Sequence, residues 1–212
     1  MALILPPRFR FFHRQLKDKK FSILDIGAGS RSPTITKKYF KNCEYHGVDI
    51  GNYNNTDSDM KAMDRYFEMD VTKLKFDEIP NNYYDVIMLS HIIEHLYNGD
   101  KVIEGLLRKL KKGGLIYIEY PGERSTRLPK MRSTLNFYDD VTHVRVFSIP
   151  EVAELLTKNG CLVLKSGTRR YWPYMLLMPI ILVYKAIQKG QVQGGTFWDI
   201  LGFAEYVYAK NK

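Results

Sequence analysis

Cysteine is scarce in this chain of 212 residues, which has only Cys43 and Cys161. Both lie in predicted strands, and a domain of this length buries enough apolar surface to be stable without disulfides. Long apolar runs are also lacking, since none reaches the ~20 residues that a membrane-spanning helix needs. The apolar residues 2–5 precede the basic ones, the reverse of the order in a signal peptide. These absences, with no internal repeat, predict one cytoplasmic domain that is soluble or lies on a membrane surface.

Acidic residues are fewer than basic ones, 23 against 32, which gives a formal charge of +9. This excess is compatible with nucleic acid, anionic lipid or a phosphorylated substrate as a partner. Charge alone does not choose among them.

The chain is organised around residues 21–30, where an apolar strand ends at Ile26 and breaks into Gly27-Ala28-Gly29. Such a turn lets a ligand contact backbone. A second short strand ends in Asp49, at the spacing typical of a ribose-binding carboxylate. Ser32 occupies the third glycine position that a pyrophosphate requires. Because S-adenosylmethionine (SAM) has no phosphate, the turn favours SAM over NAD or FAD.

The motif Asp25-Ile-Gly27-Ala-Gly29 resembles the first motif of class I SAM-dependent methyltransferases, and residues 85–96, ending in Ile-Glu-His-Leu, resemble their fourth. This resemblance, which covers residues 21–209, implies an α/β three-layer sandwich. Its sheet would be Rossmann-like, with seven mostly parallel strands and an antiparallel last strand.

The sequence pattern predicts the following strands and helices. Strands are expected at 21–26, 44–48, 66–69, 84–89, 115–120, 161–166 and 203–209, and helices at 34–40, 60–65, in the later half of 92–110 and at 151–158. We expect Lys112-Gly113-Gly114 to end the third helix. Residues 1–20 are interpreted as a basic N-terminal extension and 21–212 as the methyltransferase domain, with insertions at about 121–147 and 169–196.

The resemblance implies a set of cofactor-binding residues. These are Asp25, Gly27, Ala28, Gly29, Asp49, Ile50, Asp70, Val71, Ser90 and His91. His143, His91 and His95 are the candidates for a catalytic base, with Glu94 beside them. Alternatively, Glu94 and His95 hold a helix start and His143 caps loop backbone. No metal ligands are assigned.

A narrower resemblance concerns the acceptor. Pro121-Gly122 and residues 136–143 and 197–206 are similar to small methyltransferases of polysaccharide and glycolipid assembly. This implies O-methylation of a sugar, nucleotide sugar or lipid-linked glycan. RNA or another small molecule is an alternative acceptor, although the Asn/Asp-Pro-Pro-Tyr/Phe motif of amino-methylating enzymes is absent and nucleic acid is disfavoured. A non-catalytic SAM-binding protein is the third hypothesis.

The insertion at 169–187 contains a short apolar run, Met175 to Tyr184, which Pro179 interrupts. Basic and aromatic residues flank it, as in segments that lie in a membrane interface. With the basic N-terminus it could form a peripheral contact at the inner membrane face. The alternatives are that it packs on the core or forms a homodimer face.

Overall fold

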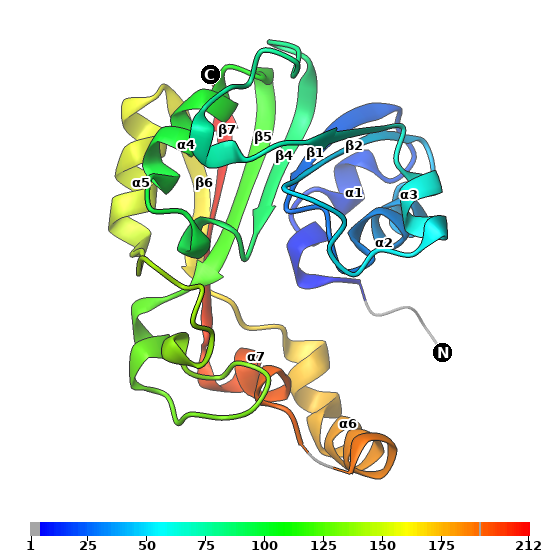
Figure 1. The fold of residues 1–212 in the computed structure, drawn as a ribbon, viewed down its shortest axis with the longest axis vertical. Coiled ribbons are helices and arrows are strands. Elements are labelled where there is room, and N and C mark those ends of the chain that lie inside the picture. The colour runs from blue at the N-terminus through cyan, green and yellow to red at the C-terminus, as the bar shows by residue number, and fades with distance from the viewer. Residues whose placement is uncertain (1–4, 191) are drawn as a thin grey trace.

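The computed structural model describes residues 5–190 and 192–212 and is built on one seven-stranded sheet (Figure 1). The strands are β1 (Phe21–Ile26), β2 (Cys43–Asp49), β3 (Arg65–Glu68), β4 (Tyr84–Ser90), β5 (Leu110–Pro121), β6 (Cys161–Thr168) and β7 (Ala204–Asn211). Their order is β3-β2-β1-β4-β5-β7-β6, and β7 is antiparallel to both of its neighbours. The other six run in one direction, so the predicted fold class is confirmed.

Helices cover both faces of the sheet (Figure 1). On one side lie α1 (His13–Leu16), α2 (Ser32–Tyr39) and α3 (Asp57–Ala62), and on the other α4 (Gly99–Leu107) and α5 (Ile149–Lys158). The last two helices, α6 (Trp172–Lys189) and α7 (Trp198–Leu201), lie beyond the ends of the strands. This gives the three predicted layers and an additional cover at one edge.

The core is divided by the sheet, because successive side chains of a strand point to opposite faces. In β1, Leu24 and Ile26 pack on the side of α4 and α5. Ile23 packs on the other side, together with Phe9 and Phe12, which are fully buried. The N-terminal segment before β1 therefore forms part of the second core.

Helix boundaries differ from the prediction: α2 and α5 each begin two residues early, and the differences at α3 and α4 have clear causes. Helix α3 begins at Asp57, earlier than expected, because Thr56 and Asp59 form a reciprocal capping box. Helix α4 ends at Leu107, and β5 already begins at Leu110, which pairs with Tyr84. The Gly113-Gly114 pair is thus an irregularity within β5 and does not end the helix.

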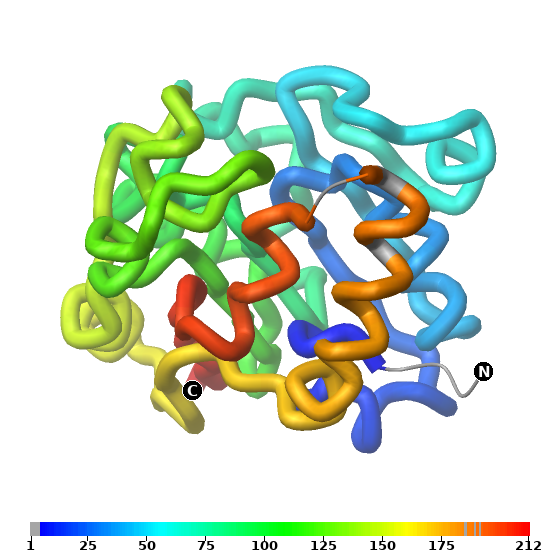
Figure 2. The backbone as a smooth tube through the Cα atoms, turned by 90° about the horizontal axis from the view of Figure 1, so that it is seen from below, coloured from blue at the N-terminus to red at the C-terminus, as the bar shows by residue number. Residues whose placement is uncertain are grey.

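Two insertions together cover the carboxyl ends of the parallel strands (Figure 1). Residues 121–147 and the segment between β6 and β7 are joined by hydrogen bonds from Gly194 N to Arg132 O (2.9 Å) and from Trp198 Nε1 to Thr134 O (2.6 Å). Figure 2 shows α6 and α7 lying across this end of the molecule. The cover therefore holds side chains from distant parts of the sequence over one edge of the sheet.

Candidate active site

A cavity of about 1000 Å³ lies at this covered edge. Most of the residues predicted to bind cofactor or to act in catalysis line it: Asp25, Gly27, Gly29, Asp49, Ile50, Asp70, Val71, Ser90, His91 and His95. The ends of β1, β2, β3 and β4 bring them together, as expected for an open α/β sheet.

The glycine turn forms one wall of the cavity. Gly27 has φ +76°, and its N–H donates to Val48 O at 2.8 Å, which ties the turn to the end of β2. A Cβ atom on Gly27 would overlap the Ile92 side chain, and one on Gly29 would lie 2.7 Å from Tyr53 O. Only glycine fits these two positions, so backbone faces the cavity there.

Two predicted carboxylates have different surroundings. Asp49 ends β2, accepts a hydrogen bond from its neighbour Ile50 N at 2.8 Å, and has its pKa raised by burial. Asp70 accepts from Thr72 Oγ1 (2.6 Å) and Thr72 N (3.0 Å), and these hydrogen bonds lower its pKa. Both carboxyl groups line the cavity.

Asp25 is held from within the fold. It is buried and accepts hydrogen bonds from Tyr45 Oη (2.5 Å) and from the Ser32 hydroxyl, so the residue at the third glycine position has a structural partner. Burial raises the pKa of Asp25, and the nearby Arg8 opposes this. Arg8 also lines the cavity, and its buried Nε has no hydrogen-bond partner among the described residues. Sequence reasoning missed Arg8 because it lies before the first strand.

Two predicted site residues do not line the cavity. Ala28 is fully buried in the core, with its N–H bonded to Val48 O and its carbonyl to Asn55. The side chain of His143 is 5% exposed, and its Nδ1 donates to Phe137 O at 2.7 Å. The prediction that His143 faces the transferred methyl group is therefore not supported by its position.

His91 lies at the end of β4 between two carboxylates. Its ring nitrogens are 3.2 Å from Glu94 and 3.1 Å from Glu119, and its backbone φ is +57°. Burial alone would lower the pKa of His91, but the hydrogen bonds to Glu119 and Glu94 raise it to about 9. The ring is a cation at neutral pH, which argues against a general base and favours a positioning role.

A buried ionic network continues from His91 and was not predicted. Arg169, at the end of β6, donates to Glu119 at 2.9 Å and to both oxygens of Asp199 at 3.1 and 3.2 Å. Arg169 and His91 hold the pKa of buried Glu119 well below its usual range. The network joins β4, β5, β6 and α7 directly under the cavity. Its only sequence signal is a carboxylate, Glu119, within an apolar strand.

The cavity is also lined by His95, Asp140, Thr142 and Trp198. His95 Nδ1 is 2.9 Å from Thr142 Oγ1, and the Thr142 hydroxyl donates to Asp140 Oδ1 at 2.6 Å. Trp198 stacks on Phe203 with ring centroids 4.6 Å apart. Three of these four were missed, because they come from the insertions, whose paths have no periodic pattern.

A family model described as a methyltransferase domain matches residues 5–166. The chain belongs to this family. The family uses SAM as methyl donor, so SAM is the cofactor of this methyltransferase. The sequence matches no curated protein.

Solved structures of methyltransferases share the fold at low sequence identity. A SAM-dependent methyltransferase from Archaeoglobus fulgidus has a TM-score of 0.61 and 21% identity. The match covers 96% of this chain and 91% of the Archaeoglobus chain. The Burkholderia thailandensis 1,6-didemethyltoxoflavin-N1-methyltransferase, solved with bound 1,6-didemethyltoxoflavin and S-adenosylhomocysteine, has a TM-score of 0.62 and 16% identity. The match covers 98% of this chain and 78% of that one. A SAM-dependent methyltransferase from Mesorhizobium loti has a TM-score of 0.62 and 11% identity, and the match covers 97% of this chain and 98% of that one.

Proposed function

We propose that this methyltransferase acts on a hydroxyl group of a sugar, nucleotide sugar or lipid-linked glycan. The observation that carries the proposal is the lining of the cavity, to which Asp140, Thr142 and the indole of Trp198 all contribute. Carboxylate and hydroxyl groups exchange hydrogen bonds with sugar hydroxyls, and a flat aromatic ring packs on the C–H face of a sugar.

The lining of the cavity supports a placement of SAM along the predicted cofactor-binding residues. In the proposed arrangement Gly27 and Gly29 lie along the methionine part, Asp49 accepts the ribose hydroxyls, and Asp70 with Val71 lies at the adenine. Arg8, with its unpaired buried Nε, suits the methionine carboxylate. SAM supplies a methyl group whose transfer forms a C–O bond, while the C–S bond breaks and its electron pair stays on sulfur.

The protein has to accept the proton of the acceptor hydroxyl. Of the three candidate histidines, His91 is already a cation and His143 does not line the cavity, while His95 lines it with Nδ1 engaged by Thr142 Oγ1 at 2.9 Å. Asp140 does line it, and since Oδ1 accepts from Thr142, Oδ2 is left to take the proton. We therefore assign proton acceptance to Asp140.

Transfer of radiolabelled methyl from SAM to a panel of acceptors tests the class of substrate. The panel contains free sugars, nucleotide sugars, polyprenyl-linked sugars and tRNA. We expect label in a sugar-containing acceptor, in a methyl ether that resists mild base. Label in tRNA alone would contradict the proposal, and SAM binding without label in any acceptor would favour the non-catalytic alternative.

A membrane contact through 169–187 and the N-terminus is part of this proposal. No described helix is long and apolar enough to cross a membrane. Helix α6 nevertheless exposes an apolar stripe at helical spacing: Trp172, Leu176, Ile180, Val183 and Ile187 are 62 to 79% exposed. A stripe so exposed does not pack on the core, which removes that alternative for this face.

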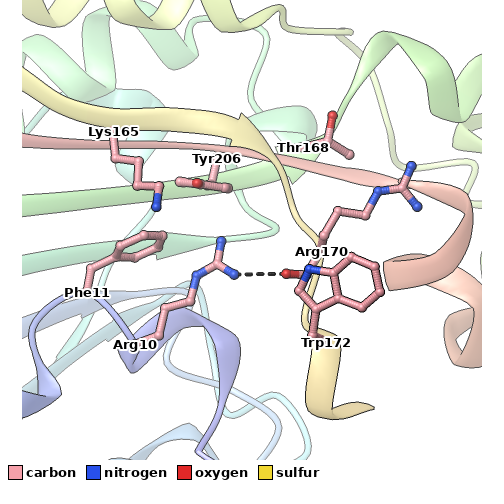
Figure 3. Close-up of a pocket in the computed structure, with 7 residues that line it drawn as sticks. All are labelled: Arg10, Phe11, Lys165, Thr168, Arg170, Trp172 and Tyr206. Atoms are coloured by element: carbon pink, nitrogen blue, oxygen red, sulfur yellow. Dashed lines mark hydrogen bonds between the residues drawn. The ribbon is translucent and has the colours of Figure 1, made fainter. Parts of the chain in front are cut away.

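A basic pocket lies beside the start of this stripe (Figure 3). It has a volume of about 440 Å³ and is lined by Arg10, Phe11, Lys165, Thr168, Arg170, Trp172 and Tyr206. Arg10 donates to Arg170 O at 3.0 Å, so the N-terminal segment and α6 share one face. Cationic and aromatic groups beside an apolar stripe support an anionic lipid surface as the occupant.

Flotation with vesicles of anionic lipid tests the membrane contact. The wild type should float at low salt, and the double variant Leu176→Ser/Ile180→Ser should remain at the bottom. Glu104→Gln, on α4 away from the stripe, is the control and should float. A wild type that stays at the bottom, or that sediments as a stable dimer through this face, would contradict the membrane contact.

A further inference from the structure

A group of metal-ligating side chains lies at the edge of the cavity. Glu94, His95 and His143 each offer one ligand atom, and these atoms lie within 4.8 Å of one another. Glu94 and His95 belong to the short 3-10 turn Ile93–His95 after β4, and His143 comes from the first insertion. Sequence analysis assigned no metal ligands, because His143 is 48 residues from His95 (143 − 95).

Glu94 has an unused buried oxygen. The residue is 1% exposed, and Oε1 pairs with His91 at 3.2 Å. Oε2 is buried and has no hydrogen-bond partner among the described residues. Because a buried carboxylate oxygen without a partner is costly, it indicates a missing cationic ligand.

The hydrogen bonds of both histidines leave a lone pair for a metal. His143 Nδ1 donates to the Phe137 carbonyl, so its proton is on Nδ1 and Nε2 is unprotonated in the neutral ring. The Thr142 hydroxyl donates to Asp140, so its oxygen accepts from His95 Nδ1 and leaves Nε2 of that ring unprotonated. Histidines that bind metals in proteins commonly donate their other nitrogen in this way.

We propose that Glu94, His95 and His143 bind one divalent transition-metal ion, such as Zn²⁺ or Mn²⁺, at the acceptor end of the cavity. Ligand bonds of about 2.0–2.2 Å place two ligands of one ion at most about 4.4 Å apart, so a shift of a few tenths of an ångström closes the site. The Asp140 carboxylate, 3.9 Å from His143 Nε2, adds a second negative charge beside the ion. His95 also lines the cavity, so the proposed ion lies beside the space assigned to the acceptor.

The role of the ion rests on the proposed transfer to a hydroxyl, whereas its binding does not. A divalent ion polarises a bound hydroxyl and lowers its pKa. The proton then passes to the Asp140 carboxylate and on to solvent, and the hydroxyl oxygen forms the C–O bond.

Equilibrium dialysis against Zn²⁺ and Mn²⁺ tests the site, with bound metal measured by mass spectrometry after the protein has been stripped with chelator. The wild type should bind one equivalent of at least one metal. Glu94→Gln and His143→Asn should each lower the affinity at least tenfold. His13→Asn removes a histidine outside the group and should bind like the wild type. Absence of stoichiometric binding, or equal affinity in all four proteins, would overturn the site.

Co²⁺ absorption keeps the test decisive if the variants do not fold. Wild-type protein with Co²⁺ should show a visible band stronger than that of the free aquo ion, and Zn²⁺ should displace it. A spectrum like that of the free ion would also overturn the site. Calorimetry with SAM is run in parallel, so metal binding without SAM binding would contradict the proposed function and leave the metal site standing.

Discussion

Asp140→Asn is expected to lower turnover by about 10²- to 10⁴-fold, the range for loss of a positioned general base. The amide keeps the carbonyl oxygen that accepts from Thr142, so the loop geometry is retained. It cannot take a proton from the acceptor. SAM affinity should remain within about threefold of the wild type, because Asp140 lies at the acceptor end.

The measurement is steady-state turnover with the acceptor identified from the panel, alongside calorimetry with SAM. Asp100→Asn, on α4 and outside the cavity, is the control. If Asp140→Asn turns over at close to the wild-type rate, the assignment of proton acceptance to Asp140 is contradicted and another group must accept the proton.

Arg169→Met is expected to destabilise the fold by about 3–5 kcal/mol, the usual cost of removing one partner of a buried ion pair. Arg169 is the common partner of Glu119 and Asp199, whose side chains are 3% and 8% exposed. Methionine fills much of the space but leaves both carboxylates without this cation. The loss should appear in the free energy of unfolding measured with urea.

Lys165→Met is the matched control, since it removes a positive charge from the exposed face of the same strand. It should change stability by no more than about 0.5 kcal/mol. A similarly small loss for Arg169→Met would mean that the network does not stabilise the junction of β4, β5, β6 and α7.

The sequence predicts those features that depend on neighbouring residues. The apolar strand before Gly27 and the acidic end of β2 at Asp49 are local patterns, and the structure brings them to one edge. The early start of α3 could also be predicted, because Thr56 and Asp59 have the spacing of a capping box. The irregular start of β5 could not be predicted, since the pairing of Leu110 with Tyr84 depends on the neighbouring strand.

The rest of the site depends on packing between distant segments. Arg8 reaches the cavity only because Phe9 and Phe12 fix the N-terminal segment on the sheet. Trp198 and Asp140 line the same cavity because the two insertions that carry them are hydrogen-bonded to each other. No spacing in the sequence indicates these contacts. For the same reason, the sequence alone does not indicate that the His143 side chain lies outside the cavity lining.

Calorimetric titration with SAM most directly tests whether this cavity is the cofactor site. The wild type should bind SAM, and Asp49→Ala should lose a charge-assisted hydrogen bond of about 1.5–3 kcal/mol, or about 10- to 150-fold in affinity. Asp57→Ala, on exposed α3, is the control and should bind like the wild type. Unchanged affinity in Asp49→Ala would contradict the position assigned to the ribose, and no SAM binding by the wild type would contradict the site as a whole.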